Sequence, residues 1–177
     1  NDTGRVVAIV GGRQQDLGSY TLNRAYQSYR QPGSSVKPLV VYTPAFERGY
    51  TPVSIVDDKY SKDGPKNSNG KYLGKIKLQK AVENSINTVA WQIFKDVTPK
   101  DGLSYLLRMN FAKITKDDYT LAAALGGLTT GVSPVEMASA YATLENDGLY
   151  REPTCIVKIM DSEGKEIVGD SDAVKEV

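Results

Sequence analysis

The residues of this sequence that could do chemistry are serines paired with lysines, because the chain contains no histidine. A serine hydroxyl is a weak nucleophile until a base takes its proton, and a lysine amine can be that base when burial or nearby positive charge keeps it partly neutral. Serine and lysine three residues apart on a helix share one face of it. The lack of histidine also excludes a Ser-His-Asp hydrolase and a His-ligated metal site.

The spacing Ser-x-x-Lys occurs three times, and the local structure expected around each copy distinguishes them. The copies that begin at Ser68 and Ser162 lie in a polar loop and in a hairpin turn. The third copy follows the turn signal at residues 31–33 and opens an apolar helix. We therefore predict Ser34 as the nucleophile and Lys37 as its proton-transfer partner. Spacing alone favours the plainer alternative, in which Ser34 is a helix N-cap and Lys37 a solvated helix residue.

A second polar pair, Ser85 and Asn87, lies between two predicted helices. A hydroxyl and an amide two residues apart can face one cleft from a turn. The hydroxyl can relay a proton, and the amide can hold a substrate carbonyl. The alternative at this stage is that Ser85 or Asn87 only caps the helix that follows.

Strand patterns open the chain and helical patterns follow. Residues 5–10 form an apolar, β-branched run that ends at two glycines, which predicts a strand buried on both faces, with residues 20–25 as its hairpin neighbour. The helix that Ser34 opens is expected to kink or end at Pro44 and to stop by Gly49.

The second half of the chain is predicted to be mostly helical. Residues 57–72 are rich in Gly, Asn, Ser and Lys and predict a loop. Apolar spacing predicts three short helices, at residues 78–82, 89–94 and 103–107. Residues 133–136, Ser-Pro-Val-Glu, form a capping box that starts a helix ending near Asn146, before Gly148. Runs at 155–160 and 165–168 predict a closing hairpin, so the fold class is α+β.

The composition excludes several classes of protein. Lys+Arg is 22 and Asp+Glu is 21, a near-balance that gives no argument for nucleic acid or for a polybasic membrane patch. No apolar run reaches the roughly 20 residues of a membrane span. The one cysteine, Cys155, lies in an apolar run and is expected to pack as a small hydrophobe. Because the chain starts at Asn1 and enters a strand at once, we interpret it as a piece of a longer protein.

Longer strings resemble the transpeptidase domain of class A, bifunctional penicillin-binding proteins. The string at 30–38, Arg-Gln-Pro-Gly-Ser-Ser-Val-Lys-Pro, is similar to the active-site signature of that family. The opening strand (residues 3–8), the segment leading to Ser85-Ile86-Asn87 (74–87) and the helix at 131–142 match in the same order. The resemblance covers nearly the whole chain.

The resemblance implies a penicillin-binding transpeptidase, β-lactamase-like fold: an antiparallel sheet flanked by helices, beside a helical lobe. It implies one partial domain over residues 1–177. Its parts would be the first strands and nucleophile helix (1–50), a helical lobe with the S-x-N motif (74–147) and a returning hairpin (153–177).

The resemblance also implies roles for residues. Ser34 would attack the D-Ala-D-Ala end of a peptidoglycan stem peptide, with Lys37 as base, Ser85 as proton relay and Asn87 binding the substrate amide. The acyl-enzyme would pass to an amine of a neighbouring stem, and β-lactam antibiotics would acylate the same serine. No cofactor or metal is implied. The parent protein would be anchored on the outer face of the bacterial cytoplasmic membrane, with a glycosyltransferase domain upstream.

The family's third motif, Lys-Thr-Gly on a sheet strand, does not occur in these residues. The nearest triplet, Thr129-Thr130-Gly131, lacks the lysine and precedes a helix cap, so the motif is expected beyond Val177. Two alternatives stay open. One is a β-lactamase or β-lactam sensor with the same serine and lysine chemistry. The other is a fragment that is inactive by itself and that dimerises or binds a partner chain along an exposed sheet edge.

Overall fold

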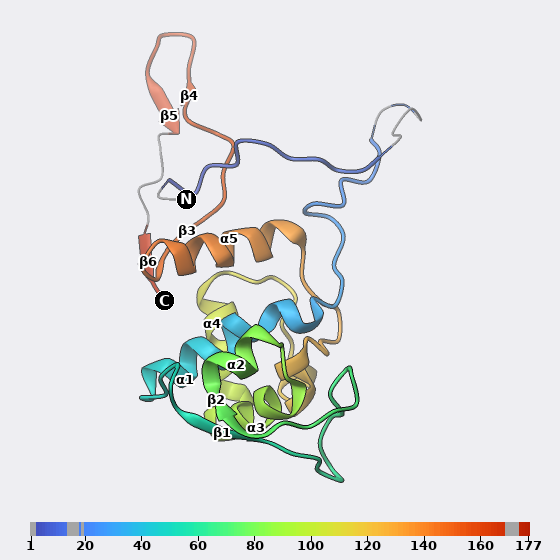
Figure 1. Cartoon of the computed structure of the whole chain (residues 1–177). Coiled ribbons are helices and arrows are strands. Elements are labelled where there is room, and N and C mark those ends of the chain that lie inside the picture. Colours follow the sequence, from blue (N-terminus) through green and yellow to red (C-terminus); the bar gives the residue numbers. More distant parts are fainter. Residues whose placement is uncertain (1–2, 14–17, 19, 169–173) are drawn as a thin grey trace. The chain divides into compact units, whose positions relative to one another are not determined.

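The computed structural model describes residues 3–13, 18, 20–168 and 174–177 (Figure 1). The chain forms two compact units. The first comprises Asn1–Tyr29, Arg108–Phe111 and Val132–Val177, and the second comprises Arg30–Leu107 and Ala112–Gly131. The residues predicted to carry the chemistry all belong to the second unit.

The serine-bearing helix of the second unit is a continuous helical run whose winding changes along its length. It begins as a 3-10 turn, η1 (Gly33–Val36), becomes π-helical in η2 (Pro38–Tyr42) and ends as the α-helix α1 (Thr43–Glu47). The predicted end at Pro44 is wrong, because α1 continues to Glu47. Pro44 is the second residue of α1 and directly follows the π-helical stretch.

The predicted stop of this helix at Gly49 is confirmed. Gly49 has a φ of +93°, in the left-handed region that favours glycine. The amide of Tyr50 then donates to the carbonyl of Ala45 at 3.1 Å, so the chain closes the helix with the hydrogen bond typical of a glycine C-cap.

A short antiparallel hairpin follows, which we had not predicted. β1 (Ile55–Asp58) pairs with β2 (Gly74–Lys77), and Asp58 lies opposite Gly74. The predicted loop is therefore the connection between two strands, at residues 59–73. This connection reaches the predicted site, because the carbonyl of Lys66 accepts from Asn87 Nδ2.

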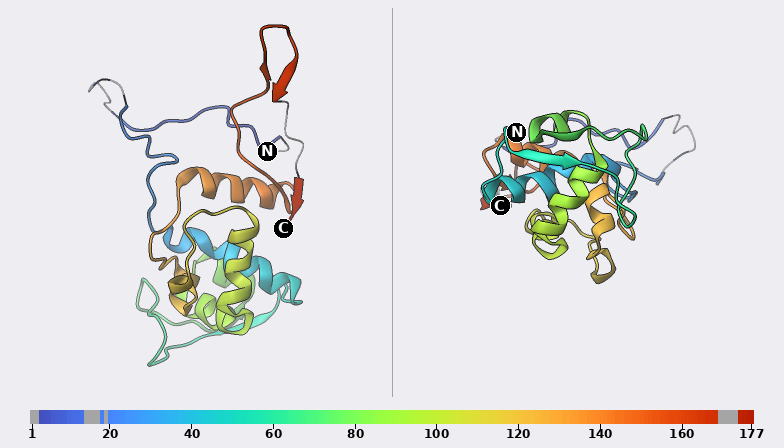
Figure 2. Two further views of the ribbon diagram at one scale, coloured as in Figure 1. Left: turned by 180° about the vertical axis from the view of Figure 1, so that it is seen from behind. Right: turned by 60° about the horizontal axis from the view of Figure 1, so that its bottom comes forward.

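The three predicted short helices are confirmed, as α2 (Leu78–Glu83), α3 (Asn87–Val97) and α4 (Pro99–Arg108). Two 3-10 turns complete this unit, η3 (Lys116–Asp118) and η4 (Leu121–Leu125). The buried apolar residues of η2, α3 and α4 form the core. Figure 2 shows the chain in two further ribbon views. Gly102 allows α4 to pack closely against η2, because a Cβ at this position would lie 2.5 Å from the carbonyl oxygen of Val40.

Two glycines bring the segment after η4 against the turn that precedes Ser34. Gly126 has a φ of +80°, and a Cβ on it would lie 2.6 Å from the Cα of Gly33. Gly131 has a φ of +92°, and a Cβ on it would lie 2.7 Å from the amide nitrogen of Gln31. Both positions therefore need glycine for backbone conformation and for space.

In the first unit, the predicted capped helix is confirmed as α5 (Pro134–Glu145). The hydroxyl of Ser133 accepts from the amide of Glu136 at 3.3 Å, and the carboxylate of Glu136 accepts from the amide of Ser133 at 2.7 Å. This is the reciprocal capping box that the sequence predicted. Asn146 is the C-cap, and Gly148 follows with a φ of +81°.

The strands of the first unit are short. β3 (Leu149–Arg151) pairs with β6 (Val174–Glu176), and β4 (Ile159–Met160) pairs with β5 (Glu166–Val168). The predicted closing hairpin is confirmed, with shorter strands than expected. Cys155 is exposed, so its predicted packing as a small hydrophobe is wrong. Helices and small antiparallel sheets together confirm the α+β class.

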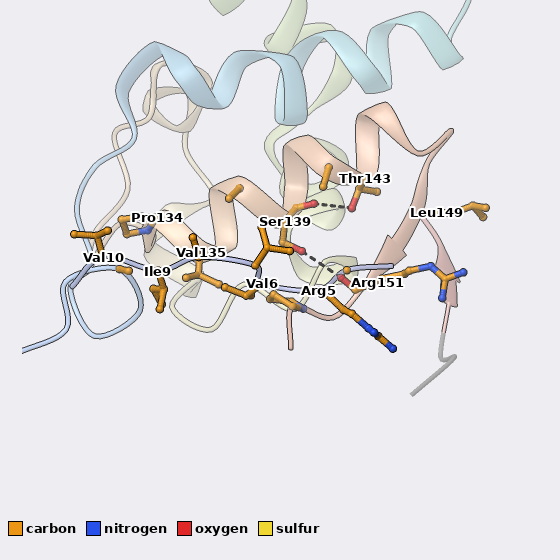
Figure 3. A pocket seen from close by; sticks show the side chains of 17 residues that line it. Arg5, Val6, Ile9, Val10, Pro134, Val135, Ser139, Thr143, Leu149 and Arg151 are labelled. Carbon is orange, nitrogen blue, oxygen red and sulfur yellow. Dashed lines mark hydrogen bonds between the residues drawn. The ribbon is translucent and has the colours of Figure 1, made fainter. Parts of the chain in front are cut away.

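The predicted strand at residues 5–10 is wrong. Arg5 forms a single bridge to Thr154, the segment joins no sheet, and the side chain of Val7 is 97% exposed. Residues 20–25 form no strand either, and part of the predicted connection, residues 14–17 and 19, lies outside the described residues. An apolar run becomes a buried strand only where other strands pair with it. Here the segment runs beside α5 and borders an open hollow of about 370 Å³, lined by Val6, Ile9 and Val135 among others (Figure 3).

Candidate active site

Lys37 is a buried lysine of the second unit: a lysine with an ordinary pKa is charged at neutral pH, and yet this residue is only 2% exposed. It occupies the junction between η1 and η2, where its neighbours Val36 and Leu39 belong to the apolar core. A lysine is almost never fully buried unless its ammonium group has partners.

Three oxygen atoms from one short segment surround the Lys37 ammonium group. Its Nζ donates to the carbonyl oxygen of Ser85 at 2.7 Å, to Ser85 Oγ at 3.1 Å and to Asn87 Oδ1 at 2.8 Å. An ammonium group has three donors, so these contacts use all of them. The structure therefore brings three of the four predicted site residues together.

Burial changes the proton affinity of this amine. Desolvation lowers the pKa of Lys37 from 10.5 to about 8. At pH 7, about a tenth of the molecules would then carry a neutral lysine, against fewer than about one in a thousand for a lysine in water. A lysine in this state can accept a proton from a neighbouring hydroxyl.

Ser34 lies in the second position of η1, one helical turn before Lys37. Its side chain is exposed, and among the described residues its hydroxyl has no hydrogen-bond partner. The N-cap of η1 is Pro32, so the alternative in which Ser34 serves as an N-cap is wrong. Ser34 thus presents a hydroxyl to solvent from the helix that also carries the buried lysine.

Ser85 and Asn87 lie on either side of the start of α3, where the backbone is held in an uncommon conformation. Ser85 has a φ of +50°, in the left-handed region. Strained residues of this kind are concentrated at functional sites. The N-cap of α3 is Ile86 and has no side-chain cap, so the alternative in which Ser85 or Asn87 is only a helix cap is wrong.

The other two Ser-x-x-Lys copies differ from this arrangement, as predicted. Residues 68–71 form a turn in the connection between β1 and β2, and residues 162–165 form the turn between β4 and β5. Neither copy is helical, and the serine and lysine of both are exposed. Residues 129–131 are not in a strand either, in agreement with the expectation that this triplet is not the missing third motif.

Sequence reasoning missed the residues that surround Asn87. Lys66 and Asn67, from the connection between β1 and β2, both bond to it: Asn87 Nδ2 donates to the Lys66 carbonyl oxygen at 3.0 Å, and the Asn87 amide donates to Asn67 Oδ1 at 3.0 Å. The polar composition of residues 57–72 predicted only a loop. The one available signal was a pair of aspartates, Asp57 and Asp58, at the end of a short β-branched run.

Within the described residues, no cluster of three or more His, Cys, Asp or Glu side chains is arranged to hold a metal ion. The helices of that part of the chain are all too short or too polar to cross a bilayer.

Comparison with known proteins gives a consistent result. Residues 1–176 match the family model described as the penicillin binding protein transpeptidase domain. Penicillin-binding protein 4 of Bacillus subtilis is 42% identical over 171 residues, a match that covers 94% of this chain and 27% of that protein. Penicillin-binding protein 1A of Clostridium acetobutylicum is 34% identical, with 99% of this chain and 24% of that protein covered. The chain thus spans about a quarter of the length of these curated relatives.

Solved structures of penicillin-binding proteins are also similar to this chain. Penicillin-binding protein 1A of Haemophilus influenzae is similar with a TM-score of 0.69 and 34% identity, over 83% of this chain and 23% of that one. The penicillin-binding protein PonA1 of Mycobacterium tuberculosis is similar in fold with a TM-score of 0.78 and 22% identity, over 94% of this chain and 46% of that one.

Proposed function

Because the chain belongs to the penicillin-binding protein transpeptidase family, we propose that it carries the nucleophile of a serine acyltransferase, Ser34, together with its proton acceptor, Lys37. The observation that carries this proposal is the burial of Lys37 against Ser85 and Asn87, one turn from an exposed serine. A solvated lysine at the same spacing would be fully protonated at neutral pH and could not accept a proton.

The proposed reaction has two steps on one serine. Neutral Lys37 takes the proton of Ser34, and Ser34 Oγ attacks the carbonyl of the penultimate D-Ala of a stem peptide. The tetrahedral intermediate collapses, the bond to the terminal D-Ala breaks, and the leaving amine takes a proton through the Ser85 hydroxyl. An amine of a second stem peptide then attacks the acyl-enzyme and releases Ser34, which regains its proton.

Asn87 is proposed to bind the amide of the stem peptide. Its Oδ1 is bonded to Lys37 and its Nδ2 to the Lys66 carbonyl, so its side chain is already fixed before substrate arrives. A fixed amide loses little freedom on binding, which favours precise placement of the substrate. The proposed site therefore consists of Ser34, Lys37, Ser85 as the proton relay and Asn87 as the substrate-binding residue.

The substrates, partners and cellular place of the whole protein are also proposals. Stem peptides ending in D-Ala-D-Ala and β-lactam antibiotics are the proposed ligands, and carboxypeptidase activity would follow when water replaces the acceptor amine. By similarity to class A relatives, the full-length protein is proposed to act outside the cytoplasmic membrane, anchored to it and joined to a glycosyltransferase domain.

Acylation of the full-length protein by a fluorescent penicillin tests this proposal. We expect one covalent label per molecule, located by mass spectrometry on the peptide that contains Ser34, and no label on Ser34→Ala. Ser35→Ala is the matched control, because Ser35 is the adjacent exposed serine and has no lysine three residues later. It should label normally.

Two results would contradict the proposal: a label that survives Ser34→Ala, or no label on the wild-type protein. Rapid hydrolysis of the bound penicillin would instead identify a β-lactamase. We expect the acyl-enzyme to persist.

A further inference from the structure

The start of α3 depends on a residue from a distant segment. Its N-cap, Ile86, has an aliphatic side chain that cannot accept a hydrogen bond, and no side-chain cap is present. The side chain of Asn67 supplies the missing acceptor instead: its Oδ1 accepts from the amide of Asn87 at 3.0 Å and from the amide of Thr88 at 3.2 Å. These are the first two amides of the helix, which have no partner within it. Asn67 thus caps α3 from outside.

Asn67 is itself fixed by a buried carboxylate. Its Nδ2 donates to Asp58 Oδ1 at 2.7 Å and to the Lys71 carbonyl oxygen at 2.9 Å. With two donors and two acceptor contacts in use, the amide of Asn67 is fully satisfied and has one orientation. Only 8% of the residue is exposed, so a change there cannot be compensated easily by water.

Asp58, at the end of β1, is completely buried. Besides Asn67, its carboxylate accepts from Thr88 Oγ1 at 2.5 Å and from the amide of Leu73 at 2.8 Å. A buried carboxylate is tolerated only when hydrogen bonds of this kind replace its water. Asp58 therefore joins β1, the loop at 59–73 and α3 at one point.

This network ends at the proposed catalytic lysine. Asn67 and the Lys66 carbonyl hold the backbone and the side-chain Nδ2 of Asn87, which leaves Asn87 Oδ1 facing Lys37 Nζ. A carbonyl acceptor at Nδ2 and an ammonium donor at Oδ1 are compatible with only one orientation of the amide. The chain of contacts runs from Asp58 through Asn67 and Asn87 to Lys37.

We propose that Asn67, anchored by Asp58, is a positioning residue that sets the geometry of Asn87 and Lys37 for acylation of Ser34. Asn67 touches neither Lys37 nor Ser34 through the contacts described, so it acts through Asn87. This inference rests on the proposed acyltransferase function. Its consequence is that the polar loop at 59–73, which contains none of the predicted site residues, controls the rate of the reaction.

The test is the rate of acylation of full-length Asn67→Ala by a fluorescent penicillin, with the fraction of molecules labelled at the end point. We expect the maximal acylation rate to fall about 10- to 100-fold, while nearly all molecules are labelled in the end. A purely structural role would do the opposite. The labelled fraction would fall as molecules unfold, and the labelled ones would react at the wild-type rate.

Asn69→Ala is the matched control. Asn69 is the same type of residue in the same loop and is exposed. Among the described residues, its side chain accepts a hydrogen bond only from the Lys71 amide, at 2.9 Å. We expect a wild-type rate. If Asn67→Ala does not fold, Thr88→Val serves as the second variant, because it removes one hydrogen bond to Asp58 and keeps the shape of the side chain. A fall of about 3-fold in the maximal rate is expected from this smaller change.

One result would overturn the inference: wild-type protein is labelled on Ser34, and the labelled Asn67→Ala molecules react at the wild-type rate. If Asn67→Ala does not fold, the same result in Thr88→Val would overturn it. Loss of activity in Asn69→Ala to the same extent would also overturn it. A failure of the proposed function looks different, because the wild-type protein would then not be labelled on Ser34 at all.

Discussion

At the scale of the residue, the burial of Lys37 determines what this site can do. Burial disfavours the ammonium form and lowers its pKa to about 8, while three oxygen acceptors hold the amine in place. The folded-state pKa lies below the ordinary value of 10.5, which we take for the unfolded chain. Protonated Lys37 therefore costs stability at neutral pH, and this cost is removed as pH rises from about 8 toward 10.5.

Acylation should follow the titration of Lys37. We expect the second-order rate of acylation by penicillin to rise with pH and to level off above an apparent pKa near 8, because only the neutral amine accepts the Ser34 proton. Between pH 6 and 7 the rate should change nearly tenfold. A pH series of labelling rates on the full-length protein measures this.

Lys37→Arg is the informative comparison, since a guanidinium group keeps the charge but stays protonated throughout this range. Its acylation rate should be at least about 100-fold lower. A flat pH profile in the wild-type protein, or a normal rate in Lys37→Arg, would show that Lys37 is not the base.

At the scale of the element, the serine-bearing helix is held by close backbone packing. The segment after η4 crosses the turn before Ser34 at Gly126 and Gly131, and the Gln31 side chain donates to the Leu128 carbonyl at 3.2 Å. The position of Ser34 thus depends on a segment about 90 residues later in the chain. A Cβ at either glycine would force this turn to move.

Gly126→Ala should be much more harmful than an ordinary glycine substitution. We expect it to lower the free energy of unfolding by about 3 kcal/mol or more, since an alanine would be strained at a φ of +80° and would also collide with Gly33. Urea denaturation of the full-length protein measures the loss. The acylation rate of the molecules that remain folded should fall as well, because the turn before Ser34 moves.

Gly49→Ala separates the cost of backbone strain from the cost of the collision with Gly33. Gly49 also has a positive φ, +93°, but a Cβ there meets open space. Its cost should be about 1–2 kcal/mol, the strain of the left-handed conformation alone. Equal losses in the two variants would mean that the packing against Gly33 contributes nothing.

At the scale of the whole molecule, many large apolar side chains of the described residues are exposed to solvent. In the first unit, Val7 and Val10 in the opening segment and Ile167 in β5 are largely exposed. Single exposed apolar residues are ordinary, but here they line the opening segment and both strands of the closing hairpin. The 177 residues also contain no Lys-Thr-Gly triplet.

The isolated 177-residue chain should therefore react poorly. We expect its labelling by fluorescent penicillin to be at least about 100-fold slower than that of the full-length protein, because the Lys-Thr-Gly motif that the family resemblance implies for the site does not occur in these residues. We also expect it to self-associate, as seen by light scattering. Circular dichroism is the control for retained helix content.

A monomeric isolated chain that is labelled at the full rate would contradict this expectation. It would mean that Ser34, Lys37, Ser85 and Asn87 form a sufficient site by themselves.

Local sequence signals were enough to predict the helices and to single out Ser34 and Lys37 as the proposed nucleophile pair. Helical spacing and the capping box at Ser133 are local signals, and local hydrogen bonds realise them in almost any context. The same reasoning selected Ser34 and Lys37 among three copies of the spacing, because only this copy opens an apolar helix.

Which side chains meet depends on how distant segments pack together. Whether residues 5–10 form a strand depends on partners elsewhere, which local pattern cannot reveal, and here the prediction was wrong. Likewise, nothing in the spacing of Lys37 shows that it is buried, and nothing in a polar loop shows that Asn67 caps α3. Burial and hydrogen bonding between distant segments arise only when the chain packs, and burial is what lowers the pKa of Lys37, as its proposed role as a base requires.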